Sequence, residues 1–149
     1  TYNRMLEEVK ASHILIRVAP DASPADTLKA YNKIIEIKKR IEAGEDFGTV
    51  AINTSEDPSA KSNEGDLGYF TSLQMVYPFE TAAYTTPVGS LSKPVRTRFG
   101  YHLIKVVDKR KAVGEVEVSH ILIRSGKDRD DAATKRQAFE VYDRLQGGI

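Results

Sequence analysis

A ten-residue segment occurs twice in this chain, and the repeat constrains the possible fold more than any other feature. Residues 8–17 read EVKASHILIR and residues 115–124 read EVEVSHILIR, so eight of ten positions are identical and six of these are consecutive. The two copies start 107 residues apart (115 minus 8), far beyond the roughly 20–50 residues of a solenoid repeat. The repeated unit is therefore predicted to be a whole small domain, with a second copy beginning after it.

The repeat divides the chain into three parts. We expect residues 1–8 to be a linker or the end of a preceding helix, residues 9–112 to be a complete domain, and residues 113–149 to be the N-terminal fragment of a second domain. In both copies the repeated strand leads through a polar loop into a helix that ends in glycine, Gly44 in the first and Gly147 in the second. Because the chain starts without Met, we expect it to be a piece of a longer protein.

Composition excludes several classes of function. Lys and Arg total 22 against 21 for Asp and Glu, a net charge of +1, so no basic surface for nucleic acid or for an anionic membrane is expected. The chain has no cysteine, which excludes disulfides, thiolate metal sites and a cysteine nucleophile. No apolar run approaches the roughly 18–20 residues of a transmembrane helix, and the first residues do not resemble a signal peptide.

Three segments of the first copy are predicted to be strands. Residues 10–17 and 101–107 alternate with a period of two, which places His13 on one strand and His102 on the other, each on the same face as its apolar neighbours two positions away. A further strand is predicted over residues 91–96, between two turns.

Helices are predicted between these strands. Ser23 can cap the first, with Pro24 at its first position. Asp46 can cap the second, and Pro78 can open the third. The apolar residues expected on their buried faces are Ala30, Ile34, Ile37 and Ile41, then Phe47, Val50 and Ala51, then Phe79, Ala82 and Ala83. Residues 54–68 are rich in turn formers. This order indicates an α+β fold with a small, mostly antiparallel sheet.

Five motifs then occur in the order found in one known family. They are SHILI (12–16), SEDPSAK (55–61), GDLGYF (65–70), QMVYPFE (74–80) and FGYHLI (99–104). On these motifs the chain resembles the parvulin-type peptidyl-prolyl cis/trans isomerases over roughly 100 residues. The resemblance implies a four-stranded antiparallel sheet wrapped by helices, with a pocket for proline on the concave face of the sheet.

The resemblance also implies a role for individual residues. Two strand histidines, an acid and a hydroxyl would form a hydrogen-bonded catalytic set, namely His13, His102, Asp57 and Thr97. Three apolar residues would line the proline pocket and a fourth would lie on its rim, namely Leu67, Met75, Phe79 and, on the rim, Phe99. Isomerisation of an X–Pro bond breaks no covalent bond, so the reaction requires neither a nucleophile nor a metal ion, and no cofactor is expected.

Other roles for the polar set stay open at this stage. A set of two histidines and an aspartate can bind a metal ion, although the two strand histidines resemble the parvulin network more closely and no metal is expected. A histidine on a strand can also be a buried structural residue. The sequence therefore indicates where a site lies better than it indicates what each residue does.

The expected function is isomerisation of X–Pro bonds in unfolded or extended polypeptides, with proline-containing polypeptide clients as partners. The alternative is a catalytically weak peptide-binding module of a chaperone. Parvulins that demand a phosphorylated residue before proline carry basic residues in the loop after the first strand. Here residues 18–23 contain none and Arg17 stands alone at the edge, so no phosphate requirement is expected. Tandem parvulin units are similar to those of bacterial extracytoplasmic chaperone-isomerases, which suggests a periplasmic or other extracytoplasmic location. No oligomeric state is predicted.

Overall fold

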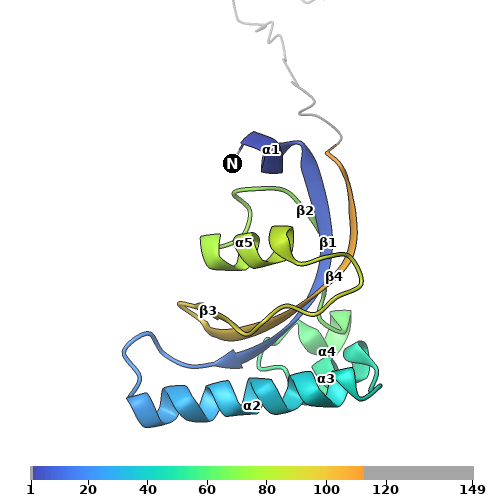
Figure 1. Cartoon of the computed structure of the whole chain (residues 1–149). Coiled ribbons are helices and arrows are strands. Elements are labelled where there is room, and N and C mark those ends of the chain that lie inside the picture. The colour runs from blue at the N-terminus through green and yellow to red at the C-terminus, as the bar shows by residue number, and fades with distance from the viewer. Residues whose placement is uncertain (1, 113–149) are drawn as a thin grey trace, which may run out of the picture. The chain divides into compact units, whose positions relative to one another are not determined.

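A four-stranded antiparallel sheet forms the centre of the molecule (Figure 1). The computed structural model describes residues 2–112. Strand β1 (Glu7–Arg17) pairs with β4 (Gly100–Lys111) along its whole length and with β2 (Asp66–Phe70) on its other side. Strand β3 (Val95–Thr97) pairs with β4, which gives the order β2-β1-β4-β3. The predicted α+β fold with a four-stranded antiparallel sheet is confirmed.

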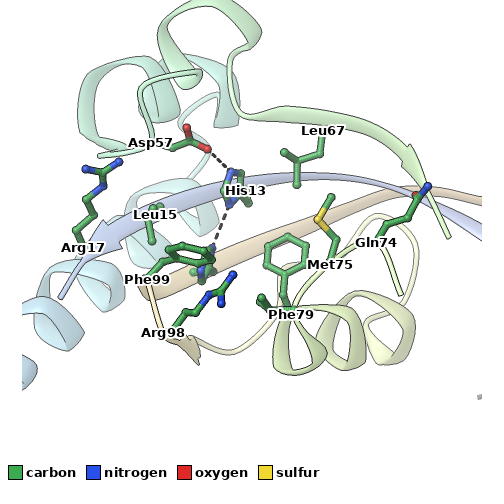
Figure 2. Close-up of a pocket in the computed structure, with 12 residues that line it drawn as sticks. His13, Leu15, Arg17, Asp57, Leu67, Gln74, Met75, Phe79, Arg98 and Phe99 are labelled. Atoms are coloured by element: carbon green, nitrogen blue, oxygen red, sulfur yellow. Dashed lines mark hydrogen bonds and ion pairs between the residues drawn. The ribbon is translucent and has the colours of Figure 1, made fainter. Parts of the chain in front are cut away.

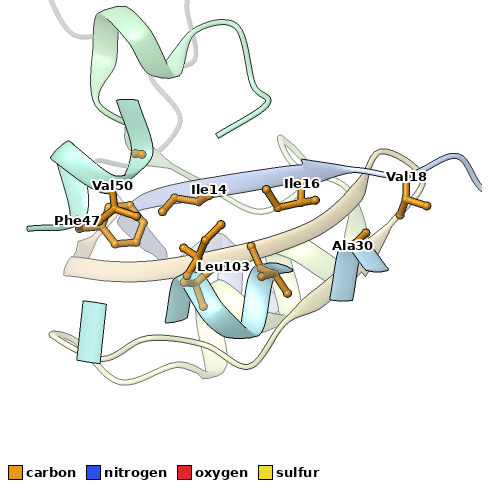
Figure 3. Packing of buried hydrophobic residues seen from close by; sticks show 10 residues of the cluster. Ile14, Ile16, Val18, Ala30, Phe47, Val50 and Leu103 are labelled. Atoms are coloured by element: carbon orange, nitrogen blue, oxygen red, sulfur yellow. The ribbon is translucent and has the colours of Figure 1, made fainter. Parts of the chain in front are cut away.

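The convex face of the sheet is covered by α2 (Pro24–Glu42) and α3 (Phe47–Thr54). Ser23 caps α2 by accepting a hydrogen bond from the Asp26 N–H, and Asp46 caps α3 in the same way from the Thr49 N–H, as their positions predict. The first hydrophobic core lies between these helices and the sheet (Figure 3) and consists of Ile14, Ile16, Val18, Ala30, Ile34, Ile37, Phe47, Val50, Ala51 and Leu103.

Inside the curve of the sheet lies α5 (Tyr77–Thr85), and α1 (Tyr2–Met5) precedes β1 near it (Figure 1). The second core fills the space between α5 and the sheet with Val9, Ala11, Phe70, Phe79, Ala83, Ile104 and Val106. The alternation of β1 is thus used on both faces, because Ile14 and Ile16 point to the first core while His13 and Leu15 point to the side that carries α5.

The structure differs from the predicted elements in the second half of the domain. Residues 54–68 hold a short helix α4 (Ala60–Asn63) and the start of β2, where only turns were predicted. The strand predicted over residues 91–96 is a single bridge at Leu91 followed by β3 from Val95. Pro94 has no N–H to donate, and β3 resumes directly after it.

Ser92 bonds to β4 within this interruption through both its backbone and its side chain. Its N–H donates to the Ile104 carbonyl at 2.8 Å, and its hydroxyl accepts from the Ile104 N–H at 3.0 Å. The two central strands also extend further than predicted, since β1 starts at Glu7 and β4 ends at Lys111. Backbone pairing between these two strands stabilises residues whose own pattern is too polar to indicate a strand.

Two expectations concern what lies around this domain. Within residues 2–112, no helix combines the length and the apolar character that a membrane crossing needs. The second copy expected over residues 113–149 lies outside the described residues.

Candidate active site

The four candidate catalytic side chains form one continuous line of polar contacts, and Figure 2 marks the two contacts that His13 makes. The Nδ1 atoms of His13 and His102 lie 3.1 Å apart. His13 Nε2 lies 2.8 Å from Asp57 Oδ2, and His102 Nε2 lies 2.8 Å from Thr97 Oγ1. The structure therefore brings together side chains from β1, β3, β4 and the loop after α3, as the family resemblance implied.

Strand register places the two histidines side by side. His13 pairs with Ile104 and Leu15 pairs with His102, so the histidines are diagonal neighbours on one face of the β1–β4 ladder. Gly65 lets the start of β2 approach this point closely. Its carbonyl accepts a hydrogen bond from the His13 N–H at 2.9 Å, its φ is +81°, and a Cβ there would lie 2.5 Å from the His13 carbonyl oxygen. A side chain at residue 65 would force the strands apart.

The loop that carries Asp57 is bound to β1 by two hydrogen bonds of the Leu15 backbone. The Glu56 N–H donates to the Leu15 carbonyl at 2.7 Å, and the Leu15 N–H donates to Ser55 Oγ at 3.1 Å. These two bonds pair the loop with β1 and fix the position from which Asp57 reaches His13.

The charge state of Asp57 follows from its hydrogen bonds. Burial opposes the charged form, but the Ser59 N–H and hydroxyl both donate to Asp57 Oδ1 at 3.0 and 2.8 Å, and His13 contacts Oδ2. Together these donors hold the pKa of Asp57 below its ordinary value. The carboxylate is thus ionised at neutral pH and accepts a hydrogen bond in each of these contacts.

Both histidines are neutral because they are buried. Burial lowers the pKa of His13, and the hydrogen bond and charge of Asp57 only partly offset it. Burial, with a further contribution from His13, lowers the pKa of His102 to about 4. The exposed fractions of the two residues are 7% and 5%, so little water reaches either ring to stabilise a charge.

These charge states fix the direction of each hydrogen bond in the line from Asp57 to Thr97. His13 donates from Nε2 to Asp57, so its Nδ1 must accept because a neutral imidazole has one N–H. His102 therefore donates from Nδ1 to His13, and its Nε2 accepts from the Thr97 hydroxyl. The Thr97 oxygen in turn lies 3.2 Å from the Phe99 N–H, which donates to it. The result is one ordered line of donors that ends on a carboxylate.

A cavity of about 440 Å³ opens beside this line. Its lining includes the three predicted pocket residues and the predicted rim residue among His13, Leu15, Arg17, Asp57, Leu67, Gln74, Met75, Val76, Phe79, Arg98, Phe99 and His102. The Phe79 ring stands edge-on to both imidazoles, with ring centroids 5.6 Å from His13 and 5.2 Å from His102. Phe99 is 48% exposed, as a rim position requires. Thr97 lies behind His102 and does not line the cavity.

Five lining residues were not assigned to the pocket from the sequence. Leu15 shares the strand face of His13, so the period-two pattern could have found it. Gln74 and Val76 lie in the same motif as Met75. Arg17 and Arg98 carried no such signal, because the structure alone places the β3–β4 turn next to the end of β1.

The candidate catalytic side chains are hydrogen-bonded one after another and do not surround a common point as metal ligands would. Within the described part of the chain, residues 2–112, no group of three or more histidine, aspartate or glutamate side chains is placed to hold an ion. His13, His102 and Asp57 instead bond to one another in sequence.

Comparison with known proteins decides the family. The model of the PPIC-type PPIASE domain matches residues 2–110. The chain belongs to this family. It contains a parvulin-type peptidyl-prolyl isomerase domain. The chain is also similar to proteins named foldase and chaperone.

The similar proteins are longer than this chain. Foldase protein PrsA of Geobacillus kaustophilus is 42% identical over 110 residues, which are 74% of this chain and 35% of that protein. Chaperone SurA of Alcanivorax borkumensis is 33% identical over 146 residues, 95% of this chain and 33% of that protein. The crystal structure of PrsA from Bacillus anthracis superimposes with a TM-score of 0.60 at 38% identity, covering 73% of this chain and 45% of that one. The chain spans about a third of the length of these two curated relatives.

Proposed function

We propose that residues 9–112 catalyse cis/trans isomerisation of X–Pro bonds in unfolded or extended polypeptides. The observation that carries this proposal is the joining of an apolar cavity to a neutral, fully hydrogen-bonded line of side chains. Family membership supports the reaction type. The assignment of the unit to residues 9–112, with residues 113–149 beginning a second copy, is part of the proposal.

The apolar side of the cavity supplies the catalytic effect. An X–Pro amide rotates slowly because its C–N bond has partial double-bond character, with a barrier of roughly 18–20 kcal/mol. In the twisted amide this resonance is lost and the group is less polar, so a dry site favours it over either planar form. Leu67, Met75 and Phe79 form such a site, and the proline ring would be held there while the preceding residue turns.

The polar side of the cavity holds the two imidazole rings in fixed positions. Every ring nitrogen of His13 and His102 is engaged in the hydrogen-bonded line, so neither imidazole needs to serve as a nucleophile. The line holds both rings against the edge of Phe79. Asp57 has a side chain 22% exposed and lines the cavity, so its negative charge disfavours orientations in which the carbonyl oxygen of the substrate points toward it.

The proposed activity carries no requirement for phosphate. Residues 18–23, which follow β1, contain no lysine or arginine. A site that demands a phosphate needs several converging cations because each charge-assisted hydrogen bond supplies only part of the recognition.

A second candidate function is peptide binding with little catalysis. Large apolar side chains are exposed in and near the loop that forms the pocket wall, with Leu73 76% exposed, Tyr77 72% exposed and Phe99 48% exposed. Such side chains can hold an unfolded client without accelerating the isomerisation of its prolines.

One experiment separates the two functions. Exchange NMR on a proline tetrapeptide should show accelerated cis/trans exchange at a small molar fraction of protein, and a titration with the same peptide should report its affinity. Binding without faster exchange would instead support the peptide-binding module.

The similar proteins support the proposed clients and location. Relatives named foldase and chaperone support unfolded proline-containing polypeptides as clients. The likeness to tandem parvulin units of bacterial extracytoplasmic chaperone-isomerases supports a periplasmic or otherwise extracytoplasmic location.

A further inference from the structure

Glu80 is a buried carboxylate that the proposed reaction does not use. It lies on α5 directly after the pocket residue Phe79 and is 2% exposed. Its Oε1 accepts a hydrogen bond from Arg4 Nη1 at 3.2 Å, and its Oε2 accepts one from the Leu73 N–H at 2.8 Å. A charged group this deep is stable only when it is paired and hydrogen-bonded, and here each oxygen has one partner.

The Leu73 bond holds a strained turn at the edge of the pocket. Leu73 has a φ of +70°, in the left-handed region that a branched side chain rarely adopts, and its side chain is 76% exposed, so burial of that side chain does not explain the conformation. The next three residues, Gln74, Met75 and Val76, all line the cavity. Strained residues persist where the surrounding structure fixes them, often next to functional sites.

Arg4 is held in place from several directions. Its guanidinium also donates to Thr81 Oγ1 at 3.2 Å and lies 5.9 Å and 5.6 Å from the ring centroids of Tyr77 and Tyr84. The Tyr84 hydroxyl lies 3.0 Å from the Arg4 carbonyl oxygen. The first helix, α1, is thereby joined to α5 through the residue that pairs with Glu80.

We propose that the Arg4–Glu80 ion pair is a positioning device for the wall of the proline pocket. Arg4 holds the Glu80 carboxylate, the carboxylate holds the Leu73 N–H, and the turn at Leu73 sets the positions of Gln74, Met75 and Val76. The inference rests on the proposed function, since it assigns these residues to the site that binds proline. Without the cation, the carboxylate is buried with no counter-charge, so the turn relaxes and the slot for the proline ring loses its shape.

Substitutions in the full 149-residue chain test the proposal. Arg4→Met should raise KM for a proline tetrapeptide about tenfold with a smaller change in kcat, because the bound ring loses its wall, and Arg4→Lys should restore most of the affinity. The Leu73 amide resonance should move in Arg4→Met and stay near its native position in Arg4→Lys. Unchanged KM together with an unmoved Leu73 resonance in Arg4→Met would overturn the proposal.

A double-mutant cycle keeps the test valid if Arg4→Met folds poorly. Glu80→Gln preserves volume and an acceptor for Leu73 but needs no counter-charge, so the Arg4→Met/Glu80→Gln double variant should bind no worse than Arg4→Met alone. Additive losses would show that the two residues act separately and would refute the proposal.

Two control variants exclude general effects. Arg40→Met removes an exposed arginine paired with Glu45 at 2.7 Å, far from the cavity lining, and should leave KM unchanged. Tyr84→Phe removes the hydroxyl of α5 that contacts the Arg4 carbonyl oxygen in α1 at 3.0 Å and the Glu7 carbonyl oxygen in β1 at 2.7 Å. It keeps the ion pair, and should leave KM within about twofold of wild type. A rise in KM in Tyr84→Phe equal to that in Arg4→Met would assign the effect to undocking of α1 and overturn the proposal. If wild type isomerises no peptide, the proposed function fails, while the Leu73 resonance still tests the positioning.

Discussion

The Nδ1 atoms of His13 and His102 lie 3.1 Å apart, so one of them carries a proton and the other accepts it. Because the His13 Nε2–H donates a hydrogen bond to Asp57, the proton between the two Nδ1 atoms is bonded to His102, and donation runs from Thr97 to Asp57. Adding a proton to His13 would make its Nδ1 a donor. His102 would then have to accept at Nδ1 and donate from Nε2 to Thr97. A protonated His13 therefore fits only if the other hydrogen bonds of the line reverse their direction.

Acid should therefore destabilise the domain in a defined pH range. The folded-state pKa of both histidines lies below the ordinary value of 6.5, and that of His102 is about 4. Between these values the unfolded chain binds protons that the folded chain does not, so stability is complete above pH 6.5 and falls as the pH drops toward 4. Urea unfolding at pH 7.5 and pH 5 measures the loss. His102→Gln should show a smaller loss between the same two pH values; an equal loss in both proteins would contradict the assignment.

Met75→Ala should lower kcat/KM by at least tenfold while the domain stays folded. Met75 is partly buried and lines the cavity, and each tenfold in rate corresponds to roughly 1.4 kcal/mol of transition-state stabilisation. The chain's other methionine offers a matched control, since Met5 is 47% exposed and lies outside the cavity lining. Met5→Ala should isomerise at the wild-type rate. Phe79→Ala should lose as much activity, but Phe79 is 3% exposed in the second core, so its loss should also cost roughly 3–5 kcal/mol of stability.

Asp57→Asn should keep measurable activity. The amide oxygen of Asn can still accept from His13, so the line keeps its direction while the charge that faces the cavity is lost. The Asn NH2 group then faces the Ser59 N–H, so the bonds to Ser59 are weakened. We expect a fall in kcat/KM of less than about a hundredfold and no covalent adduct by intact-mass spectrometry. Complete loss in a folded variant, or a trapped adduct, would show that the carboxylate has a covalent role. Asp21→Asn, at an exposed position in the loop after β1, is the control.

The residue before proline should influence turnover through charge. Arg17 and Arg98 both line the cavity, and neither guanidinium is in an ion pair within the region from residue 2 to residue 112. A Glu-Pro peptide should be turned over roughly three to ten times faster than a Lys-Pro peptide at low salt, with the difference falling as salt is added. Arg98→Gln should reduce this difference, and Arg40→Gln should not.

Phosphate should add little to that preference. A phosphoserine-proline peptide should be turned over no better than its glutamate analogue, since residues 18–23 supply no additional cation. A hundredfold preference for the phosphopeptide would represent nearly 3 kcal/mol of recognition, more than these two arginines explain, and would refute the absence of a phosphate requirement.

Deletion of residues 115–149 should leave isomerase activity within a factor of two. Every cavity residue in the described region lies between His13 and His102, and His120 is predicted to have no catalytic role. Comparing kcat/KM of the full chain and of residues 1–114 is the measurement. A large drop would show that the C-terminal segment completes the site and that the boundary proposed at residue 112 is wrong.

Local signals in the sequence determined the elements that make their own hydrogen bonds or bury one regular face. Ser23 and Asp46 cap the helices that follow them, because an N-cap needs only a short side chain three residues before a free N–H. The period-two pattern around His13 determined which side chains face the pocket, because a strand alternates whatever it pairs with. The family resemblance likewise pointed to all four members of the hydrogen-bonded line, three of them within its motifs and Thr97 just before the last one.

Only the tertiary structure decided how distant segments meet. The start of β2 and the interrupted β3 depend on pairing with β1 and β4, and short edge strands carry too little pattern to indicate it. Arg98 reaches the pocket because the β3–β4 turn lies beside the end of β1. Glu80 can be buried as a carboxylate because the Arg4 side chain and the Leu73 N–H donate hydrogen bonds to its two oxygens. A sequence pattern reports which face of an element is apolar, but a polar residue becomes buried or part of a site only through partners that the fold brings from elsewhere in the chain.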